Sequence, residues 1–370
     1  MRFKTTRDNL LTGITTVGRA VAGKSPMPVL GGILIEADEE GLTFTGTNLE
    51  FYISCWLTAS DIIPGSIVLP ARYFSEIIRR LPEGPVSFIA DLSSYSAAIR
   101  YGRAEASLNG YAAEEFPHLP VLTPRAQFSL RSEVLRDVTR QVLYAVGQDE
   151  LRPVFTGILL ELTEQELRAV ATDTHRLALA RVDLPGSDIN LTNVILPGKA
   201  LGELGRLLSA AEDEETEVAV ADSYATFANG PVRVLTRLIE GQFPDYRQVI
   251  PGGYRSRLDQ VEPLTLLAAV ERASTLAANE TPLVVLELKA TELTISARSQ
   301  VGSLIEELPA ALDGEALQVA FNAGYLIDAL RAAGPAPVSL EFNGPVGPAL
   351  IRPVAEDNGY LGLVLPVRLA

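Results

Sequence analysis

Four short sequence patterns recur along this chain, and their spacing constrains the fold more than any other feature. The first is an alternating apolar segment followed by a polar corner, and it occurs at 42–50, 167–175 and 293–300. Successive copies are offset by about 125 residues. Solenoid repeats have periods of roughly 20–50 residues, whereas a period near 125 is the size of a whole domain.

The other three patterns keep the same order and nearly the same offset. They are a proline followed by an apolar run, a helical segment, and a Phe-Pro dipeptide. The proline with its apolar run lies at 28–35, 153–160 and 282–288. The helical segment lies at 69–80, 196–207 and 321–331, and the Phe-Pro dipeptide lies at 116–117 and 243–244. Because four landmarks share one order, we expect three homologous domains at 1–125, 126–252 and 253–370.

Each copy combines strand-like alternation with two helical segments, which predicts an α+β fold with helices on one face of antiparallel sheets. In the first copy Leu10, Ile14, Val17 and Val21 follow helical spacing, and Gly23 is expected to end that helix. The expected helices are 6–22, 71–81, 132–146, 198–210, 263–278 and 322–333.

The residue types exclude several kinds of site. The single cysteine, Cys55, excludes an intrachain disulfide and fits a cytoplasmic protein. Cys55, His118 and His175 cannot supply four zinc ligands, and no carboxylate cluster replaces them, so we expect no metal and no cofactor. The start of the chain has no signal-peptide pattern, and no stretch approaches the roughly 18 apolar residues of a membrane span.

Residues 18–25 match the phosphate-binding pattern G-x-x-x-x-G-K-[ST] letter for letter. That loop needs a strand before it and a helix after it, whose free N–H groups face the phosphates. Here a helix precedes the loop, and Pro26 and Pro28 oppose a helix after it. A helix end followed by a loop is therefore favoured, and a P-loop ATPase that uses Lys24 is the alternative.

The corner at 172–176 holds Asp173 and His175, which lie on the same side of the chain if it is extended. A carboxylate beside an imidazole is a frequent catalytic pair. However, no serine or cysteine nucleophile lies in a recognisable motif, and the matching residues of the first copy are Asn48 and Glu50. We therefore favour a structural or binding role and predict no catalytic residue.

Five segments spread over the chain are specific in combination: Leu69-Pro-Ala-Arg72, Leu81-Pro-Glu-Gly84, Thr172-Asp-Thr-His-Arg-Leu177, Phe243-Pro-Asp-Tyr-Arg247 and Leu365-Pro-Val-Arg-Leu369. In this order, without a long insertion, they resemble the bacterial DNA sliding clamp, the beta subunit of DNA polymerase III. The resemblance implies a head-to-tail homodimer that closes into a ring, with helices lining the hole and sheets outside. Such a processivity factor of DNA replication encircles duplex DNA independently of its sequence and tethers the replicative polymerase. A clamp loader that uses ATP opens the ring, and the clamp itself is not an enzyme.

The resemblance also implies a partner-peptide groove between the second and third domains, which binds the polymerase, the loader and other DNA-processing proteins. Its matching positions are Arg152, Phe155, Thr172, Thr174, His175, Arg176, Leu177, Pro244, Val249, Leu363, Leu365, Pro366, Val367 and Arg368. Thr174 stands where the family usually has a smaller residue, and Leu365 and Val367 stand where methionines are frequent. A pocket with fewer methionines is expected to adapt less readily to different peptides.

Two further sets of positions follow from the resemblance. Those that match residues near the duplex are Lys24, Arg79, Gln148 and Lys199. Those that match the contact between subunits are Arg103, Leu108, Thr275, Leu276, Glu306 and Glu307, with Arg103 expected to pair with Glu306 or Glu307.

The net charge of −15 argues against DNA binding unless the charge is distributed unevenly. The six expected helices hold 11 Arg and Lys against 7 Asp and Glu, a balance of +4, so the rest of the chain carries −19. A basic bore with an acidic exterior would guide DNA into a ring. The remaining alternative is an acidic multidomain scaffold that does not bind DNA.

Overall fold

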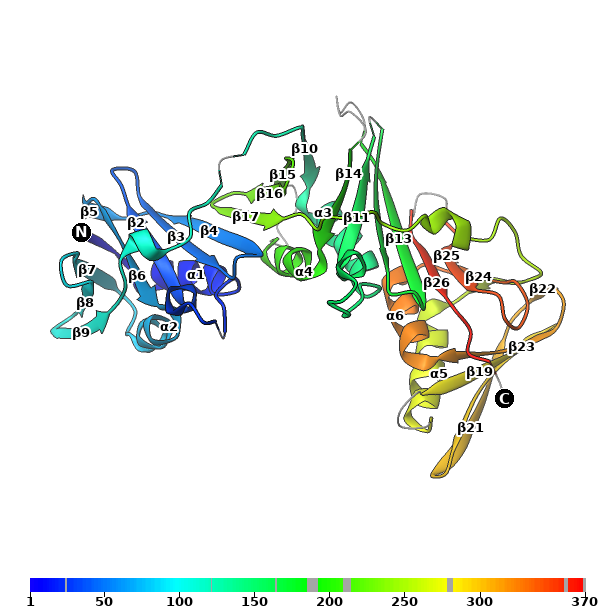
Figure 1. Ribbon diagram of the computed structural model, residues 1–370. Helices are drawn as coiled ribbons and strands as arrows, with labels where there is room; N and C mark the ends of the chain where they lie inside the picture. Colours follow the sequence, from blue (N-terminus) through cyan, green and yellow to red (C-terminus); the bar gives the residue numbers. More distant parts are fainter. Residues whose placement is uncertain are drawn as a thin grey trace. The chain divides into compact units, whose positions relative to one another are not determined.

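Antiparallel sheets dominate the protein, and paired helices lie against them (Figure 1). The computed structural model describes residues 1–23, 25–120, 122–163, 165–184, 192–208, 214–277, 282–355 and 359–368. It separates into one unit of residues 1–135 and 203–238 and a second unit of residues 136–202 and 239–370. Lys24 lies outside the described residues.

The first unit contains a five-stranded and an eight-stranded sheet. The five-stranded order is β5 (Ser60–Ile63), β1 (Arg2–Thr6), β7 (Pro85–Asp91), β8 (Ser96–Tyr101) and β9 (Ala104–Asn109). The eight-stranded order is β10 (Ala126–Arg131), β15 (Glu215–Val220), β16 (Tyr224–Asn229), β17 (Val232–Arg237), β4 (Phe51–Leu57), β3 (Leu42–Thr47), β2 (Gly32–Ala37) and β6 (Gly65–Pro70).

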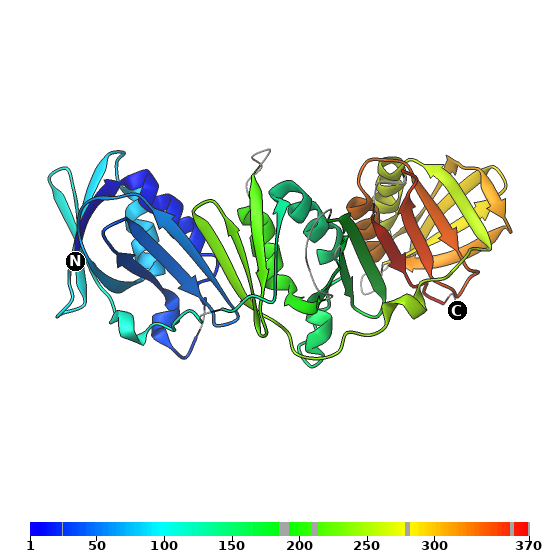
Figure 2. The same cartoon turned by 90° about the horizontal axis from the view of Figure 1, so that it is seen from above.

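The helices α1 (Arg7–Val17) and α2 (Ala71–Arg80) pack together and against the strands β2 to β4 (Figure 2). Phe74 of α2 lies between Phe44 of the long sheet and Phe88 of the short one, with ring centroids 6.2 and 6.4 Å away. Phe3 stacks on Phe88 at 4.6 Å. This buried aromatic cluster therefore links one helix to both sheets, with aromatic pairs in favourable geometry.

The second unit contains a nine-stranded and a four-stranded sheet. The nine-stranded order is β14 (Thr192–Pro197), β11 (Gly157–Leu162), β12 (Glu166–Thr172), β13 (Arg176–Asp183), β26 (Leu361–Val364), β25 (Ala349–Pro353), β24 (Val338–Phe342), β18 (Ser256–Val261) and β22 (Leu312–Gly314). The four-stranded order is β21 (Gly302–Pro309), β20 (Glu292–Ser299), β19 (Leu283–Lys289) and β23 (Leu317–Asn322).

The remaining helices are α3 (Ser132–Leu143), α4 (Gly198–Leu207), α5 (Pro263–Thr275) and α6 (Ala323–Ala333). The helices α5 and α6 lie side by side, and α6 packs against β25 and β26 (Figure 1). Among the described residues each sequence copy thus contributes two α-helices and antiparallel strands, which confirms the predicted α+β class. No helix in the described ranges is long and apolar enough to span a membrane.

The two long sheets run across the boundaries between sequence copies. In the first, β17 of the second copy pairs with β4 of the first, Val234 opposite Ile53. In the second, β13 of the second copy pairs with β26 of the third, Leu177 opposite Leu363. Residues far apart in sequence therefore share one sheet, and the expected partner site lies at the second of these junctions.

Several helices end earlier than the apolar spacing predicts, and the prediction of Gly23 as the end of the first helix is wrong. That helix ends at Val17, and the N–H groups of Ala20 and Val21 bond to carbonyls three residues back. The same shorter-range bonds follow α3 at Ala145 and α5 at Ala277. A tightened last turn keeps apolar residues near the same face, so sequence spacing alone does not separate it from α-helix.

Candidate functional site

The corner between β12 and β13 is built by side chains that bond to its own backbone. The Thr172 hydroxyl donates to the Arg176 carbonyl oxygen at 2.7 Å. One carboxylate oxygen of Asp173 accepts the N–H groups of His175 at 2.9 Å and of Arg176 at 3.0 Å. Thr174 has a φ of 78°, in the left-handed region that is costly for a β-branched residue. The corner is therefore rigid, and Thr174 is held exposed at its tip.

The matching corner of the first copy has the same turn chemistry. Asn48 accepts the N–H groups of Glu50 and Phe51, both at 3.0 Å, and Leu49 has a φ of 77°. Asp173 thus repeats the turn-forming task of Asn48, and its carboxylate bonds to backbone and arginine. This geometry supports the expected structural role of the corner over catalysis.

Arg176 is held by two carboxylates and two aromatic rings. Its guanidinium bonds to Asp173 at 3.0 Å and to Asp328 of α6 at 2.6 Å. The same group lies 4.5 Å from the centroid of the Tyr325 ring and 5.4 Å from that of Tyr144. Its side chain is only 13% exposed. Arg176 therefore joins the second sequence copy to the third, beside the expected groove, through charge-assisted and cation–π contacts.

Further contacts strengthen this junction. The Tyr144 and Tyr360 hydroxyls lie 2.8 Å apart, and Tyr360 donates to the carbonyl oxygen of Ala329 at 2.9 Å. Burial raises the pKa of both phenols well above their ordinary value, so both stay neutral at physiological pH. The His175 ring stacks on Tyr325 with centroids 6.1 Å apart, which places the imidazole on the same surface.

The C-terminal segment lies directly beside the corner. Leu363 pairs with Leu177 across the sheet, and the Leu365 N–H donates to the carbonyl oxygen of His175 at 2.9 Å. Val367 is anchored further along, where its N–H donates to Ala320 at 2.8 Å. Leu177 and Leu363 are buried, whereas Leu365 is 38% exposed. An exposed apolar side chain over a buried apolar floor is a suitable anchor point for a peptide.

The segment that leads from the second copy to the third packs on the same apolar floor. Tyr246 is buried in a cluster with Leu177 and Leu363, and Phe243 packs against this cluster. Val249, at the end of the short helix η4 (Tyr246–Val249), is 53% exposed. The structure therefore gathers the expected groove residues of the corner, the connecting segment and the C-terminal segment around one apolar cluster.

The expected rim residues form a cluster next to this site. The Arg152 guanidinium lies 5.1 Å from the centroid of the Phe155 ring and bonds to Asp149 at 2.8 Å. That hydrogen bond lowers the pKa of the Asp149 carboxyl. Val154, between the two rim residues, packs against the apolar cluster of Leu177 and so connects the rim to it. Pro244 and Arg368 are exposed, and Pro366 is half-buried.

The described residues expected near DNA are exposed polar groups, and two of them lie at the ends of helices. Arg79, in the last turn of α2, pairs with Glu76 at 3.4 Å and its side chain is 61% exposed. Lys199, in the first turn of α4, lies 3.8 Å from Glu150 and its side chain is 74% exposed. Gln148 is exposed as well. Such solvent-exposed pairs are weak, so both cations are free to exchange partners with a phosphate.

The observed helices also keep a basic balance. They hold 10 Arg and Lys against 7 Asp and Glu, a balance of +3 in a chain of net charge −15, so the rest carries −18. The balance is one unit below the expected +4 because Arg19 lies beyond the end of α1. The separation of charge between helices and the rest therefore persists.

Three of the expected subunit contacts, Leu108, Glu306 and Glu307, lie on strands at the edges of their sheets, and Thr275 ends α5. Leu108 belongs to β9, and Arg103 precedes that strand. Glu306 and Glu307 belong to β21, and Leu276, just after α5, lies beside Gly302 of the same strand. Glu306 is already bonded to Arg272 within the chain, at 3.0 and 2.5 Å, which lowers its pKa.

Sequence reasoning missed four residues of these surfaces. Ile305 on β21 is 72% exposed, and its alternation with half-buried neighbours was the available signal. Val301, in the turn just before this strand, is 81% exposed. Tyr325 and Asp328 contact the corner from α6, and nothing local in the sequence links them to it.

Comparison with known proteins agrees with this arrangement. Family models for the N-terminal, central and C-terminal domains of the DNA polymerase III beta subunit match residues 1–120, 129–245 and 247–368. The beta sliding clamp of Bacillus subtilis is 34% identical over 380 residues, covering all of both chains. The chain belongs to the beta sliding clamp family.

Solved structures of this family support the same fold. The sliding clamp of Bacillus subtilis superposes with a TM-score of 0.94 at 33% identity, over the whole of both chains. The beta subunit of Pseudomonas aeruginosa gives 0.93 at 28% identity with the same coverage, and a clamp from that organism has been solved with griselimycin bound. The beta sliding clamp of Staphylococcus aureus is 33% identical.

This family membership confirms the three-domain prediction and rejects the ATPase alternative. In the structure α1 precedes the glycine-rich segment, and the short helix η1 (Pro28–Gly31) leads directly into β2. The context of a phosphate-binding loop, strand then helix, is therefore missing from the described residues here.

The chain is a processivity factor of DNA polymerase III and a non-catalytic accessory subunit. In the described ranges no cluster of three His, Cys, Asp or Glu side chains could hold a metal ion.

Proposed function

We propose that this processivity factor works as a head-to-tail homodimer that encircles duplex DNA and binds polymerase, loader and other DNA-processing proteins through one peptide site. The observation that carries the peptide site is the pairing of β13 with β26, which sets Leu177 beside Leu363 and leaves Leu365 exposed. We place the domain boundaries near residues 125 and 252 and the protein in the cytoplasm.

The ring is closed by pairing β9 of one subunit with β21 of the other. Among the described strands, β9 and β21 are each at the edge of their sheet. An unpaired strand edge is a ready surface for the addition of another strand. Leu108, Leu276 and Ile305 would supply a small apolar contact at this junction. Since Glu306 is already bonded to Arg272, Glu307 is the better partner for Arg103.

A charge exchange tests this junction. Arg103→Glu is expected to weaken the dimer, and Glu307→Arg in the same chain is expected to restore it, as measured by analytical ultracentrifugation. Glu306→Arg is the control, because its carboxylate is used within the chain. Equal rescue by both second changes would contradict the assignment of Glu307.

DNA is held through weak contacts, for which Arg79, Gln148, Lys199 and Lys24 are the proposed residues. Exposed cations that are only loosely paired suit sliding, because each neutralised phosphate adds salt-sensitive affinity. Enclosure by a ring removes the need for tight binding. The acidic remainder of the chain would keep DNA away from the outer surface.

The peptide site is tested by binding. The probe is the tightest binder among fluorescein-labelled peptides that tile the polymerase III catalytic subunit of the same organism, followed by fluorescence anisotropy. Leu365→Asp and Val249→Asp are expected to weaken binding by at least about tenfold, since each places a charge on an apolar anchor surface. Leu264→Asp is the matched control, because Leu264 is 61% exposed on α5. Full binding by both site variants would reject this site.

A further inference from the structure

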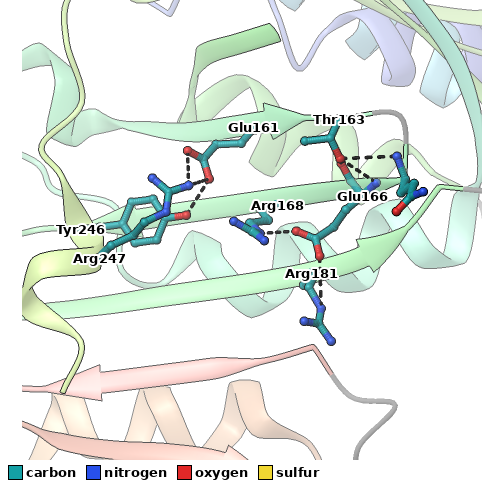
Figure 3. Close-up of polar contacts among 8 residues, drawn as sticks. Glu161, Thr163, Glu166, Arg168, Arg181, Tyr246 and Arg247 are labelled. Carbon is teal, nitrogen blue, oxygen red and sulfur yellow. Dashed lines mark hydrogen bonds and ion pairs between the residues drawn. The ribbon is translucent and has the colours of Figure 1, made fainter. Parts of the chain in front are cut away.

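A carboxylate is buried under the partner-binding site. Glu161 lies on β11, whose residues are all buried, and is only 7% exposed. It accepts a hydrogen bond from the Tyr246 hydroxyl at 2.6 Å and bonds from the Arg247 guanidinium at 2.7 and 2.8 Å (Figure 3). A buried carboxylate is tolerated only when it is paired and hydrogen-bonded, and these contacts supply the partners that the burial of Glu161 requires.

Both partners of Glu161 belong to η4, in the segment that connects the second domain to the third. Tyr246 is buried in the apolar cluster of Leu177 and Leu363. Arg247 lies over the Tyr246 ring, 4.7 Å from its centroid. A further side-chain bond lies at this helix, since Asp245, which precedes η4, accepts a hydrogen bond from the Gln248 side chain at 3.0 Å. The carboxylate therefore fastens one end of η4 to the sheet, and Val249 ends the same short helix.

We propose that Glu161 is a positioning residue of the partner-binding site, which holds η4 on the sheet and so keeps Val249 in place for the peptide without touching the peptide. This inference rests on the peptide site proposed above. If η4 were loose, binding would have to order it, and ordering costs affinity. The prediction is specific to Glu161, because its bonds reach the connecting segment.

Glu166 on β12 provides a matched comparison. It lies on the same face of the sheet, since Glu161 is opposite Arg168 and Arg168 is two residues after Glu166. Its carboxylate pairs with Arg168 and, at 3.6 Å, with Arg181 of β13 (Figure 3). Glu166 therefore connects neighbouring strands, whereas Glu161 connects the sheet to η4. Changing Glu166 alters neither Tyr246 nor Arg168, the two residues whose side chains bond to each other beside Glu161.

The test compares Glu161→Gln with Glu166→Gln in the full-length protein, using the same labelled polymerase peptide at a temperature where circular dichroism shows every variant folded. Glu161→Gln is expected to weaken peptide binding by about threefold to tenfold. This is the cost of ordering one or two side chains of η4 when the peptide binds. Glu166→Gln is expected to bind like the wild type. Tyr246→Phe, which removes one of the three bonds, is expected to give a smaller loss.

A double-mutant cycle separates positioning from general destabilisation. Val249→Ala removes the side chain through which Glu161 is proposed to act, so in that background Glu161→Gln is expected to cost less than about twofold in affinity. A loss in affinity that is equally large with and without Val249 would overturn the proposal, and so would wild-type affinity in Glu161→Gln. If the wild type bound no polymerase peptide, or if Val249→Asp bound normally, the peptide site itself would be wrong and this inference would fall with it.

Discussion

Replacing Arg176 by alanine is expected to loosen the junction between the second and third domains. The change removes charge-assisted bonds to Asp173 and Asp328 and contacts with two tyrosine rings. Removing one partner of a buried pair costs about 3–5 kcal/mol, and the lower end applies because the Asp328 side chain is 37% exposed. We therefore expect a loss of about 3 kcal/mol, or roughly a 150-fold rise in the opening equilibrium.

The assay is native-state hydrogen exchange followed by mass spectrometry, because a chain of several domains has no single free energy of unfolding. Peptides from α6 should exchange roughly 150-fold faster in Arg176→Ala. Peptides from α2, in the other unit, should not change. Arg331→Ala is the control on the same helix, since its pair with Glu271 is exposed on both sides and is worth at most about 1 kcal/mol. An effect of Arg176→Ala no larger than that of Arg331→Ala would refute this account of the junction.

Three further outcomes are expected. Ile305→Asp should raise the dimer dissociation constant at least about tenfold in sedimentation experiments, since a 72% exposed isoleucine on β21 would lose its apolar contact. Val346→Asp is the control and should leave the constant unchanged, because Val346 is 66% exposed in a turn away from this strand. Lys199→Ala should lower the slope of log affinity for short linear DNA against log salt by about one, as measured by titration; an unchanged slope would remove Lys199 from the DNA surface. Burial, and after it the Glu161 carboxylate, raise the pKa of the Tyr246 phenol from 10 to about 12. Because the folded pKa is above the unfolded one, the stability that the neutral phenol contributes is present below pH 10 and is lost between pH 10 and 12. Its tyrosinate absorbance, isolated by subtracting the Tyr246→Phe spectrum, should titrate at lower pH in Glu161→Gln; an unshifted midpoint would contradict the contact.

Regular features of the fold were predictable because they repeat locally. Helical spacing in each copy located six helices, and alternation located the strands of the corners. The ends of the helices were not predictable to the residue, because Val21 continues the apolar spacing of α1 from within a tighter turn. The pairing of β17 with β4 was also out of reach, since it joins residues of different copies and no periodicity records it.

The candidate site was predictable only in part. Leu177 and Leu363 were expected to line it, and the structure sets them opposite each other. Arg176 was expected there as well. Its contact with Asp328, which joins the second domain to the third, could not be predicted because the two residues are 152 positions apart in the sequence. Glu161 stands in an apolar run, which is a local sign of a buried charge, yet its partners lie 85 and 86 residues further on.

The central claim is that the protein holds DNA by enclosing it, and topology tests this most directly. The wild-type protein is loaded onto a nicked circular plasmid by its clamp loader, and the amount retained is measured by gel filtration before and after one restriction cut. Enclosure predicts retention on the circle and loss after linearisation, because a ring slides off a free end. Equal retention on the circular and the linear molecule would contradict the account, and so would failure to be retained on either.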